Sequence, residues 1–149
     1  MSPDACPLCL LRPEDAVWHD AHWQVIRAQE SGFPAFYRLV LRRHAAEFTD
    51  LTATERQRCM SLVAVMEHVL RDTLQPTKIN LATLGNVVPH LHWHVIARFE
   101  GDSHFPQPVW AAPVRAQDPA ALASLSARLP QLEVRMREAL DACGPCAAA

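Results

Sequence analysis

The 149-residue chain has little that would take it to a membrane or to a nucleic acid. No apolar run approaches the ~20 residues that a helix needs to cross a bilayer, and residues 1–11 lack the charged start and long apolar middle of a signal peptide. The net charge is only −2 and the sequence pI is near 6.4, so no basic excess attracts nucleic acid polymers or anionic lipids. We therefore expect a cytoplasmic protein that binds neither a membrane nor a nucleic acid polymer.

The number of cysteines in the chain is odd. Five cysteines without an export signal argue against a disulfide framework. The hydrophobic content of 50% is enough for a real core, and a chain of this length suits one domain. Because there is no internal repeat and no convincing domain boundary, we expect a single domain over residues 1–149.

What the chain does have is an unusual run at residues 90–96. This run holds three of the eight histidines, and they alternate with apolar residues as in a half-buried β-strand. Such a strand would present His90, His92 and His94 in a row on one face, about 6 to 7 Å apart. Imidazole has an unperturbed pKa of about 6.5, so it can exchange protons, attack or bind metal near neutral pH. Burying three imidazoles costs solvation that Val or Ile would not, which favours a functional row.

Two kinds of chemistry fit this row. Histidines two apart on a strand can bind one metal ion, as in β-barrels that hold zinc or iron. Alternatively, one neutral histidine attacks phosphorus, and a nucleotidyl-histidine forms and is hydrolysed. Residues 78–89 read as a strand that pairs with the histidine strand through a short Gly-Asn loop, which would place the amides of Asn80 and Asn86 beside the imidazoles. Uncharged donors suit a phosphate. No Asp or Glu lies between Asp72 and Glu100, so no nearby carboxylate could serve as a metal ligand.

The run of residues 90–96 resembles the signature of the histidine triad (HIT) family of nucleotide hydrolases and transferases. Gly85-Asn86 resembles the family's Gly-Gln before the first triad histidine, and Asn80 stands about where many members carry a phosphate-binding asparagine. Residues 37–44 are similar to the family's strand that ends in two basic residues and a histidine. The resemblance covers about residues 5–110, the core of the expected domain.

The resemblance implies a role for each of these residues. His92 would be the nucleophile at the α-phosphorus, and His94 would bond a non-bridging oxygen and stabilise the charge of the transition state. The backbone carbonyl of His90 would hold the Nδ1 proton of His92, which leaves Nε2 free to attack. Asn80 and Asn86 would contact phosphate or the bridging oxygen.

One position departs from the family pattern. Members often have Ser or Thr after the Gln, whereas this chain has Val87, and Asn86 is one methylene shorter than Gln. That hydroxyl would help the leaving group depart. The preferred leaving group is therefore open.

The resemblance also implies a structural metal and a ribose contact. Cys6 and Cys9 have metal-ligand spacing, and some HIT relatives bind structural zinc with such a pair, the histidine after the basic dipeptide and the first triad histidine. The ligands here would be Cys6, Cys9, His44 and His90, although His44 could instead contact phosphate. Catalysis itself would need no cofactor. In the family an acidic residue contacts the ribose, for which Glu30 is the candidate and Gln29 its alternative.

Cys143-Gly144-Pro145-Cys146 spells the thioredoxin active-site tetrapeptide. In that fold the motif opens a helix, but here it follows one. We interpret it as a tail without redox function.

The remaining patterns predict an α+β fold. Apolar residues on either side of a turn predict a hairpin over residues 16–27, and residues 38–44 form a further strand. Thr52 and Glu55 have capping-box spacing ahead of apolar residues at three and four, which predicts an amphipathic helix over 52–74. Residues 118–142 are helical, with Pro130 as a kink or a split. We expect a HIT-like antiparallel sheet of about five strands, one long helix on its face and a C-terminal helix beyond.

The segment between the histidine strand and the last helix, residues 99–115, is rich in proline, so it is neither a helix nor a central strand. Its aromatic residues could close over the site, pack on a partner subunit or simply pack on the surface.

The sequence therefore predicts an enzyme that cleaves at the α-phosphate of a dinucleoside polyphosphate such as diadenosine tetraphosphate, or of a nucleoside phosphoramidate. HIT relatives are typically homodimers, which implies the same here. Two other functions stay open. One is a metal-dependent enzyme that uses the three histidines as ligands on an all-β barrel, and the other is a nucleotide-binding regulator with weak turnover, suggested by Val87.

Overall fold

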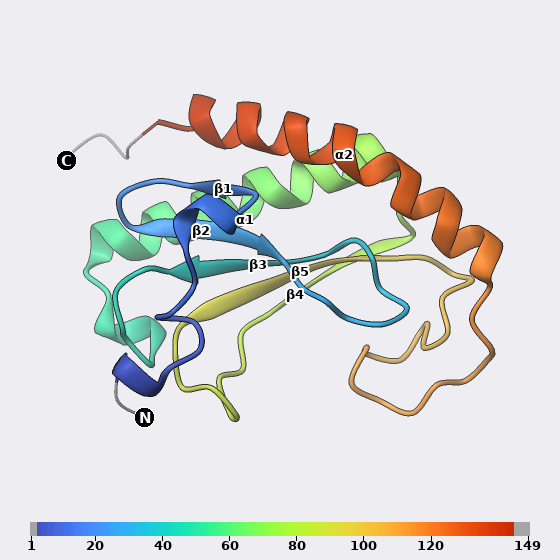
Figure 1. Ribbon diagram of the computed structural model, residues 1–149, viewed down its shortest axis with the longest axis horizontal. Helices are drawn as coiled ribbons and strands as arrows, with labels where there is room; N and C mark the ends of the chain where they lie inside the picture. Colours follow the sequence, from blue (N-terminus) through green and yellow to red (C-terminus); the bar gives the residue numbers. More distant parts are fainter. Residues whose placement is uncertain (1–2, 145–149) are drawn as a thin grey trace.

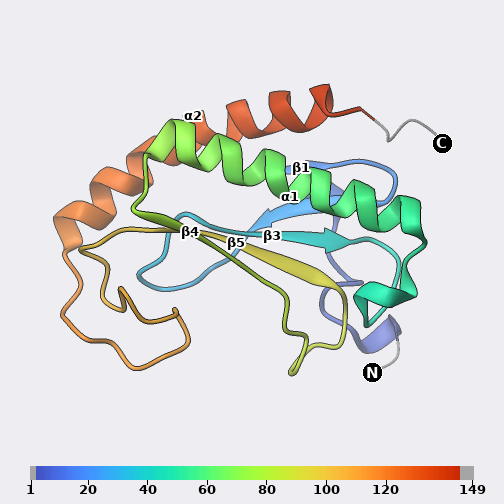
Figure 2. The ribbon, with the colours of Figure 1, turned by 180° about the vertical axis from the view of Figure 1, so that it is seen from behind.

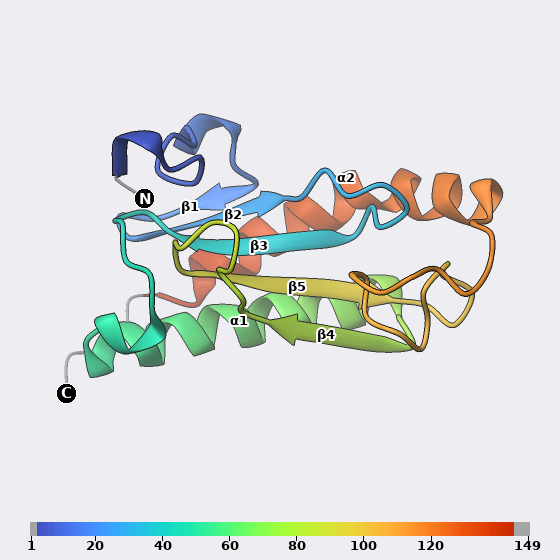
Figure 3. The same ribbon diagram turned by 90° about the horizontal axis from the view of Figure 1, so that it is seen from below.

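The computed structural model describes residues 3–144. Five antiparallel strands form one sheet in the order β1-β2-β3-β5-β4. Two long helices, α1 and α2, lie together over one face of this sheet (Figures 1 and 2), and neither of them covers the other face (Figure 3). The strands are β1 Trp18–His19, β2 Trp23–Arg27, β3 Phe36–Leu41, β4 Lys78–Ala82 and β5 His92–Arg98, and the α-helices are α1 Ala53–Leu74 and α2 Pro119–Ala142. Three short 3-10 helices complete the described elements: η1 Pro3–Ala5, η2 Pro13–Asp15 and η3 Phe48–Asp50. The α+β prediction is confirmed.

Each central strand divides its side chains between the two faces of the sheet, because alternate residues of a strand point in opposite directions. The face under the helices holds the main core, which includes Leu39 of β3, Val95 of β5 and Leu62 of α1. The other face holds two small apolar clusters. One contains Val40 with Cys6 and Leu8 of the N-terminal segment, and the other contains Phe36 and Ile96 with Phe33 and Ala28.

The long helix forms as its sequence predicts. Thr52 caps α1, and its side chain and that of Glu55 bond reciprocally to backbone N–H groups in a capping box. The helix ends at Gln75, which adopts a left-handed conformation with φ 51° just before Pro76. His68, on the outer side of this helix, is exposed.

The C-terminal helix is continuous at Pro130, so of the two predicted effects of this proline the split does not occur. Asp118 caps the helix by accepting bonds from the N–H groups of Ala120 and Ala121, and α2 then continues through Pro130 to Ala142 without splitting. Leu129 and Leu132, on either side of the proline, are both buried in the main core. Their burial holds the two halves in one helix, although proline removes one backbone hydrogen bond.

The central strands start and end about two residues away from their predicted bounds. β3 begins at Phe36 and ends at Leu41, so His44 lies in the following loop. β5 begins at His92 and runs to Arg98, so His90 lies before the strand, not on it. None of the helices in the described chain is both long and apolar enough to cross a membrane.

Candidate active site on the open face of the sheet

Two of the three histidines lie side by side on the face of the sheet that the helices leave open. β5 directs His92 and His94 to this face, where they lie opposite Val40 and Arg38 of β3. The two rings meet edge to face with their centroids 4.8 Å apart. Packing between strands leaves His92 8% exposed and His94 5% exposed. The expected row of three imidazoles on one strand face is therefore a pair.

His90 does not lie on the open face with the other two histidines, because both its ring and its backbone carbonyl bind other groups of the protein. Its ring is fully buried, and Nε2 lies 2.5 Å from the carbonyl oxygen of Leu41. A carbonyl only accepts, so Nε2 carries the proton and Nδ1 keeps its lone pair. The backbone carbonyl of His90 lies 2.6 Å from Nδ1 of His92, which places the proton of His92 on Nδ1.

The free nitrogen of His92 is Nε2. Nε2 of His92 has no hydrogen-bond partner among the described residues. It is also not shut off from solvent, so a substrate can reach it. Burial lowers the pKa of His92, and the nearby charge of Arg38 lowers it further. The hydrogen bond to the His90 carbonyl raises the pKa, but the net shift is downward. The ring at neutral pH is thus an uncharged base with an accessible lone pair.

His94 is also uncharged at neutral pH. Burial lowers its pKa to about 4, with further lowering by His92 and Arg38. Its Nδ1 is buried with no partner among residues 3–144. An unpaired lone pair is less costly to bury than an unpaired N–H, which favours the tautomer with the proton on Nε2. His94 can therefore donate a hydrogen bond from Nε2.

Aromatic side chains from outside the strand enclose His94. Phe36 of β3 and Trp110 of the proline-rich segment lie with their ring centroids 5.3 and 5.2 Å from the His94 ring. Of the interpretations open for this segment, the structure supports the one that brings an aromatic residue to the site. Trp110 itself is 52% exposed.

The predicted phosphate contacts divide between two environments. Asn80 lies on the same face as the histidines, opposite Ile96, but its Oδ1 accepts a 2.7 Å hydrogen bond from Arg98. Its amide group is thereby oriented, with the NH₂ group left as a donor. Asn86 lies in the exposed loop before His90, and the structure gives it no hydrogen bond to the site. Val87 beside it is 86% exposed.

Arg98 is the residue that the sequence interpretation missed. It is 1% exposed and forms a two-bonded ion pair with Asp102, with N–O distances of 2.8 and 3.0 Å. It also donates to the carbonyl of Gln107, 2.8 Å away. These bonds anchor the proline-rich segment that carries Trp110. The signal was present in the sequence, because Arg98 continues the alternation of His92, His94 and Ile96 on the strand.

Glu30, the candidate for the ribose contact, is already paired. Its Oε1 accepts a 2.8 Å bond from Arg38, the residue directly opposite His94. Gln29, the alternative, is exposed in the same loop. The structure therefore places an Arg–Glu pair on the histidine face, where the sequence interpretation had only a single acid.

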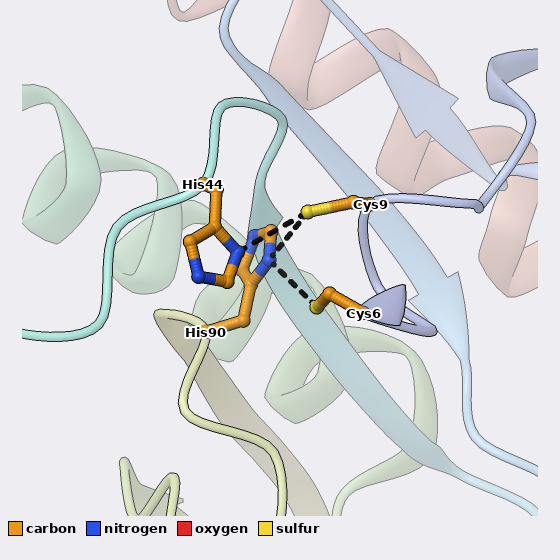
Figure 4. Close-up of side chains that lie close together, drawn as sticks. All are labelled: Cys6, Cys9, His44 and His90. Atoms are coloured by element: carbon orange, nitrogen blue, oxygen red, sulfur yellow. Dashed lines mark hydrogen bonds between the residues drawn. The ribbon is translucent and has the colours of Figure 1, made fainter. Parts of the chain in front are cut away.

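A second cluster collects the residues proposed as metal ligands. Cys6 and Cys9 of the N-terminal segment face His44 from the loop after β3 and His90 from the loop before β5 (Figure 4). Their four donor atoms all lie within 4.8 Å of one another. The Sγ atoms lie 3.2 to 3.3 Å from Nδ1 of the histidines. Of the three triad histidines, only His90 belongs to this cluster.

The donor set suits zinc. Two thiols and two imidazoles make a tetrahedral Cys₂His₂ set, in which bond lengths of about 2.3 Å to sulfur and 2.0 Å to nitrogen separate the donors by about 3.6 Å. The observed distances are close to this value. Nε2 of His90 donates to the Leu41 carbonyl, which directs the lone pair of Nδ1 into the cluster, as outer partners of ligating histidines do. These residues could bind a zinc ion.

The C-terminal tetrapeptide is only partly described. Cys143 is the C-cap of α2 and lies 3.3 Å from Nη1 of Arg58. Pro145 and Cys146 lie outside the described residues.

The fold and the site define an α+β protein with two histidines on the open face of an antiparallel sheet, and comparison with known proteins gives the family. The HIT domain matches residues 11–101, more than half of the chain. A histidine triad protein of Bradyrhizobium japonicum is 31% identical, with 79% of this chain and 90% of that chain covered and a TM-score of 0.62. One from Marinobacter aquaeolei is 28% identical, with 81% and 89% covered and a TM-score of 0.63.

The chain belongs to the HIT (histidine triad) family, whose members are generally nucleotide hydrolases and transferases. A histidine triad family protein of Mycobacterium smegmatis described as zinc-bound shares the fold, with 18% identity, 96% of this chain and 100% of that chain covered, and a TM-score of 0.61. No protein of curated function matches the sequence.

Proposed function

We propose that this protein cleaves nucleotides at the α-phosphate through a covalent intermediate on His92. The observation that carries the proposal is the 2.6 Å contact between Nδ1 of His92 and the carbonyl of His90. This contact leaves an accessible, unprotonated Nε2 on the open face of the sheet. A histidine held in this tautomer is a nucleophile, and phosphorus is the centre that such a nitrogen attacks in this family.

The reaction would proceed in two displacements. Nε2 of His92 forms a bond to the α-phosphorus while the bond from phosphorus to the leaving group breaks, and the leaving group takes a proton from solvent. Water then attacks the same phosphorus, the N–P bond breaks, and the nucleoside monophosphate leaves. Nε2–H of His94 donates to a non-bridging oxygen and stabilises the charge that develops there.

The substrate would lie across the open face between the two histidines and the aromatic pair of Phe36 and Trp110. The free NH₂ group of Asn80 supports a role in holding the phosphate, and Asn86 could reach it from the loop. Glu30 keeps one carboxylate oxygen, Oε2, without a bond in the described structure, so a ribose hydroxyl remains a suitable partner for it. We favour dinucleoside polyphosphates such as diadenosine tetraphosphate and nucleoside phosphoramidates as substrates.

We propose that Cys6, Cys9, His44 and His90 hold a structural zinc ion. The ion would supply cross-linking: it would tie the N-terminal segment to the loops that follow β3 and precede β5. With His44 engaged in this cluster, 3.2 Å from Cys9, we no longer favour it as a phosphate contact.

We also propose that the protein is a homodimer. β4 is an edge strand of the sheet, with Leu81 and Leu84 exposed on it and just after it. An exposed apolar edge strand is suited to pairing with a second copy. Sedimentation equilibrium at micromolar concentration measures this directly, and a monomeric mass would contradict it.

Turnover of labelled diadenosine tetraphosphate and of adenosine phosphoramidate, with and without a chelator, tests the function. We expect turnover that resists chelation, is abolished by His92→Ala, and leaves a nucleotidyl adduct on His92 detectable by mass spectrometry after acid-free quenching. His68→Ala removes an exposed histidine of α1 and is the matched control, expected to retain full activity.

The other outcomes identify the alternatives. Turnover that requires an added divalent metal would favour a metal-dependent enzyme over the covalent route. Tight binding of nucleotide without any product would favour a regulator, and the exposed Val87 in place of a hydroxyl is the feature that motivates it.

A further inference from the structure

Two arginines lie on the histidine face of the central strands, and they differ in how their donors are used. An arginine side chain carries five N–H donors. Arg98 uses its Nε and both terminal nitrogens, in bonds to Asp102, Asn80 and Gln107. Arg38 uses only Nη2, in its bond to Glu30. Its Nε is shut off from solvent and has no acceptor among the described residues.

Arg38 lies beside the reacting histidines. It is paired with His94 across the antiparallel strands β3 and β5, and directly opposed residues have Cβ atoms about 4.5 to 5.5 Å apart. Its guanidinium carbon lies 5.5 Å from the centre of the Phe36 ring, which itself contacts His94. The charge of Arg38 lowers the pKa of both His92 and His94, as expected for a cation close to both rings.

The position is an unfavourable one for a residue with only a structural role. The side chain of Arg38 is 26% exposed, its Nε is shut off from solvent, and two histidines are its neighbours. A buried N–H without an acceptor costs free energy, and a single surface ion pair with Glu30 recovers little of it. An anion on this face would satisfy both the unpaired N–H and the charge.

We propose that Arg38 is a phosphate-binding residue, whose unused N–H donors bind a non-bridging oxygen of the nucleotide at His92, and that Glu30 positions its guanidinium. This inference rests on the proposed nucleotide-cleaving function. It adds a positively charged phosphate contact to a site in which the proposed contacts, His94, Asn80 and Asn86, are all uncharged. It predicts that the protein recognises the charge of the phosphate, separately from the nucleoside.

The chain contains a close control for this residue. Arg27 of β2 is paired with Tyr37, the neighbour of Arg38 in β3, so it points to the opposite face of the sheet. Like Arg38 it forms an ion pair with a glutamate, Glu133, at 3.3 Å. Arg27→Met therefore removes the same charge and the same kind of ion pair, but away from the histidines.

Titration calorimetry with AMP and with adenosine tests the proposal on the wild type, Arg38→Met, Arg38→Lys and Arg27→Met. We expect Arg38→Met to weaken AMP binding by about 10- to 100-fold, the range for a lost hydrogen bond to a charged group. Binding of adenosine, which has no phosphate, should change by less than about twofold. Arg38→Lys should fall between, because lysine keeps the charge but not the planar fork. Arg27→Met should match the wild type.

The salt dependence of AMP binding gives an independent measurement. Since Arg38 contributes a charge to phosphate binding, raising the salt concentration should weaken AMP binding less in Arg38→Met than in the wild type.

Three results would overturn the proposal. Arg38→Met could bind AMP as the wild type does, AMP and adenosine could weaken together in Arg38→Met and Arg38→Lys, or Arg27→Met could have the same effect as Arg38→Met. In each case the wild type still binds and cleaves nucleotide, so the proposed function stands. A wild type that neither binds AMP nor cleaves any substrate would contradict the proposed function itself.

Discussion

At the scale of single residues, His90 connects the two clusters of the site. Its Nδ1 faces Cys6 and Cys9, its Nε2 donates to the Leu41 carbonyl, and its own carbonyl accepts a hydrogen bond from Nδ1–H of His92. All of its side-chain hydrogen-bonding capacity is therefore used within the protein, and none is directed at the open face. In the proposed mechanism His90 would position His92 through its backbone carbonyl, and its side chain would not contact a substrate on that face.

His94 gives the stability of the protein a defined dependence on pH. Its pKa is about 4 in the folded protein and about 6.5 in the unfolded chain, so between these values the unfolded chain binds more protons. The free energy of unfolding should therefore fall as the pH falls from 6.5 towards 4. We expect the wild type to lose about 2 to 3 kcal/mol more than His94→Asn between pH 7.5 and pH 4.5.

Urea unfolding of the two proteins across this range measures the difference. The comparison cancels acid effects that both proteins share. Parallel curves for the wild type and His94→Asn would show that His94 is charged or exposed in the folded protein.

At the scale of elements, α2 contains an avoidable weakness. Pro130 is exposed in the interior of the helix, where it removes one backbone hydrogen bond and crowds the preceding turn. Pro130→Ala should raise the free energy of unfolding by about 1 to 3 kcal/mol, the upper value being reduced because proline also restricts the unfolded chain. Thermal and urea unfolding of both proteins measure this change in the free energy of unfolding. An unchanged or lowered stability of Pro130→Ala would mean that the proline ring makes contacts that alanine cannot replace.

The elements with strong local signals could be predicted from the sequence, and the ends of the strands could not. Thr52 with Glu55 and the regular apolar spacing define α1, since capping and periodicity are properties of neighbouring residues. By contrast, β5 starts only at His92. The ring of His90 instead contacts Cys6 and Cys9, which lie more than 80 positions earlier in the chain. That contact depends on the folded chain and leaves no local signal.

The candidate site shows the same division. His92 and His94 follow from the alternation in the strand, and they share a face as predicted. The pairing of Arg38 with His94 depends on the register between β3 and β5, which alternation alone does not specify. The approach of Trp110 to His94 depends on how Arg98 and Asp102 fold a proline-rich segment, which no periodic pattern describes.

At the scale of the whole molecule, distant segments enclose the open face at its two ends. The N-terminal segment packs at one end through Cys6 and Leu8 on Val40, and the segment that carries Val109 packs at the other on Phe36 and Ile96. His92, His94 and Arg38 lie between these clusters, because Val40 is opposite His92 and Phe36 is opposite Ile96. Cys6 and Leu8 are the buried side chains that the N-terminal segment brings to this contact, and Cys6 also belongs to the cysteine and histidine cluster, which is therefore a second candidate for holding the segment.

This arrangement predicts that metal stabilises the fold more than it affects the chemistry. Protein purified without added metal should contain about one zinc per chain by plasma mass spectrometry. Cys9→Ser should lose the metal and lower the melting temperature by about 8 to 16 °C, which corresponds to ~4 kcal/mol for a ligand at a thousand times its Kd in a chain of this size. Cys143→Ser, which changes a cysteine outside the cluster, should keep both the metal and the melting temperature.

Turnover at 25 °C separates a structural ion from a catalytic one. Cys9→Ser should still cleave nucleotide below its melting transition, because His92 takes its orientation from the backbone carbonyl of His90 and not from the imidazole ring of that residue. Folded Cys9→Ser without turnover would show that the metal contributes directly to the reaction. Wild type that contains no metal, with a melting temperature that zinc does not raise, would show that the four residues are held together as thiols and imidazoles alone.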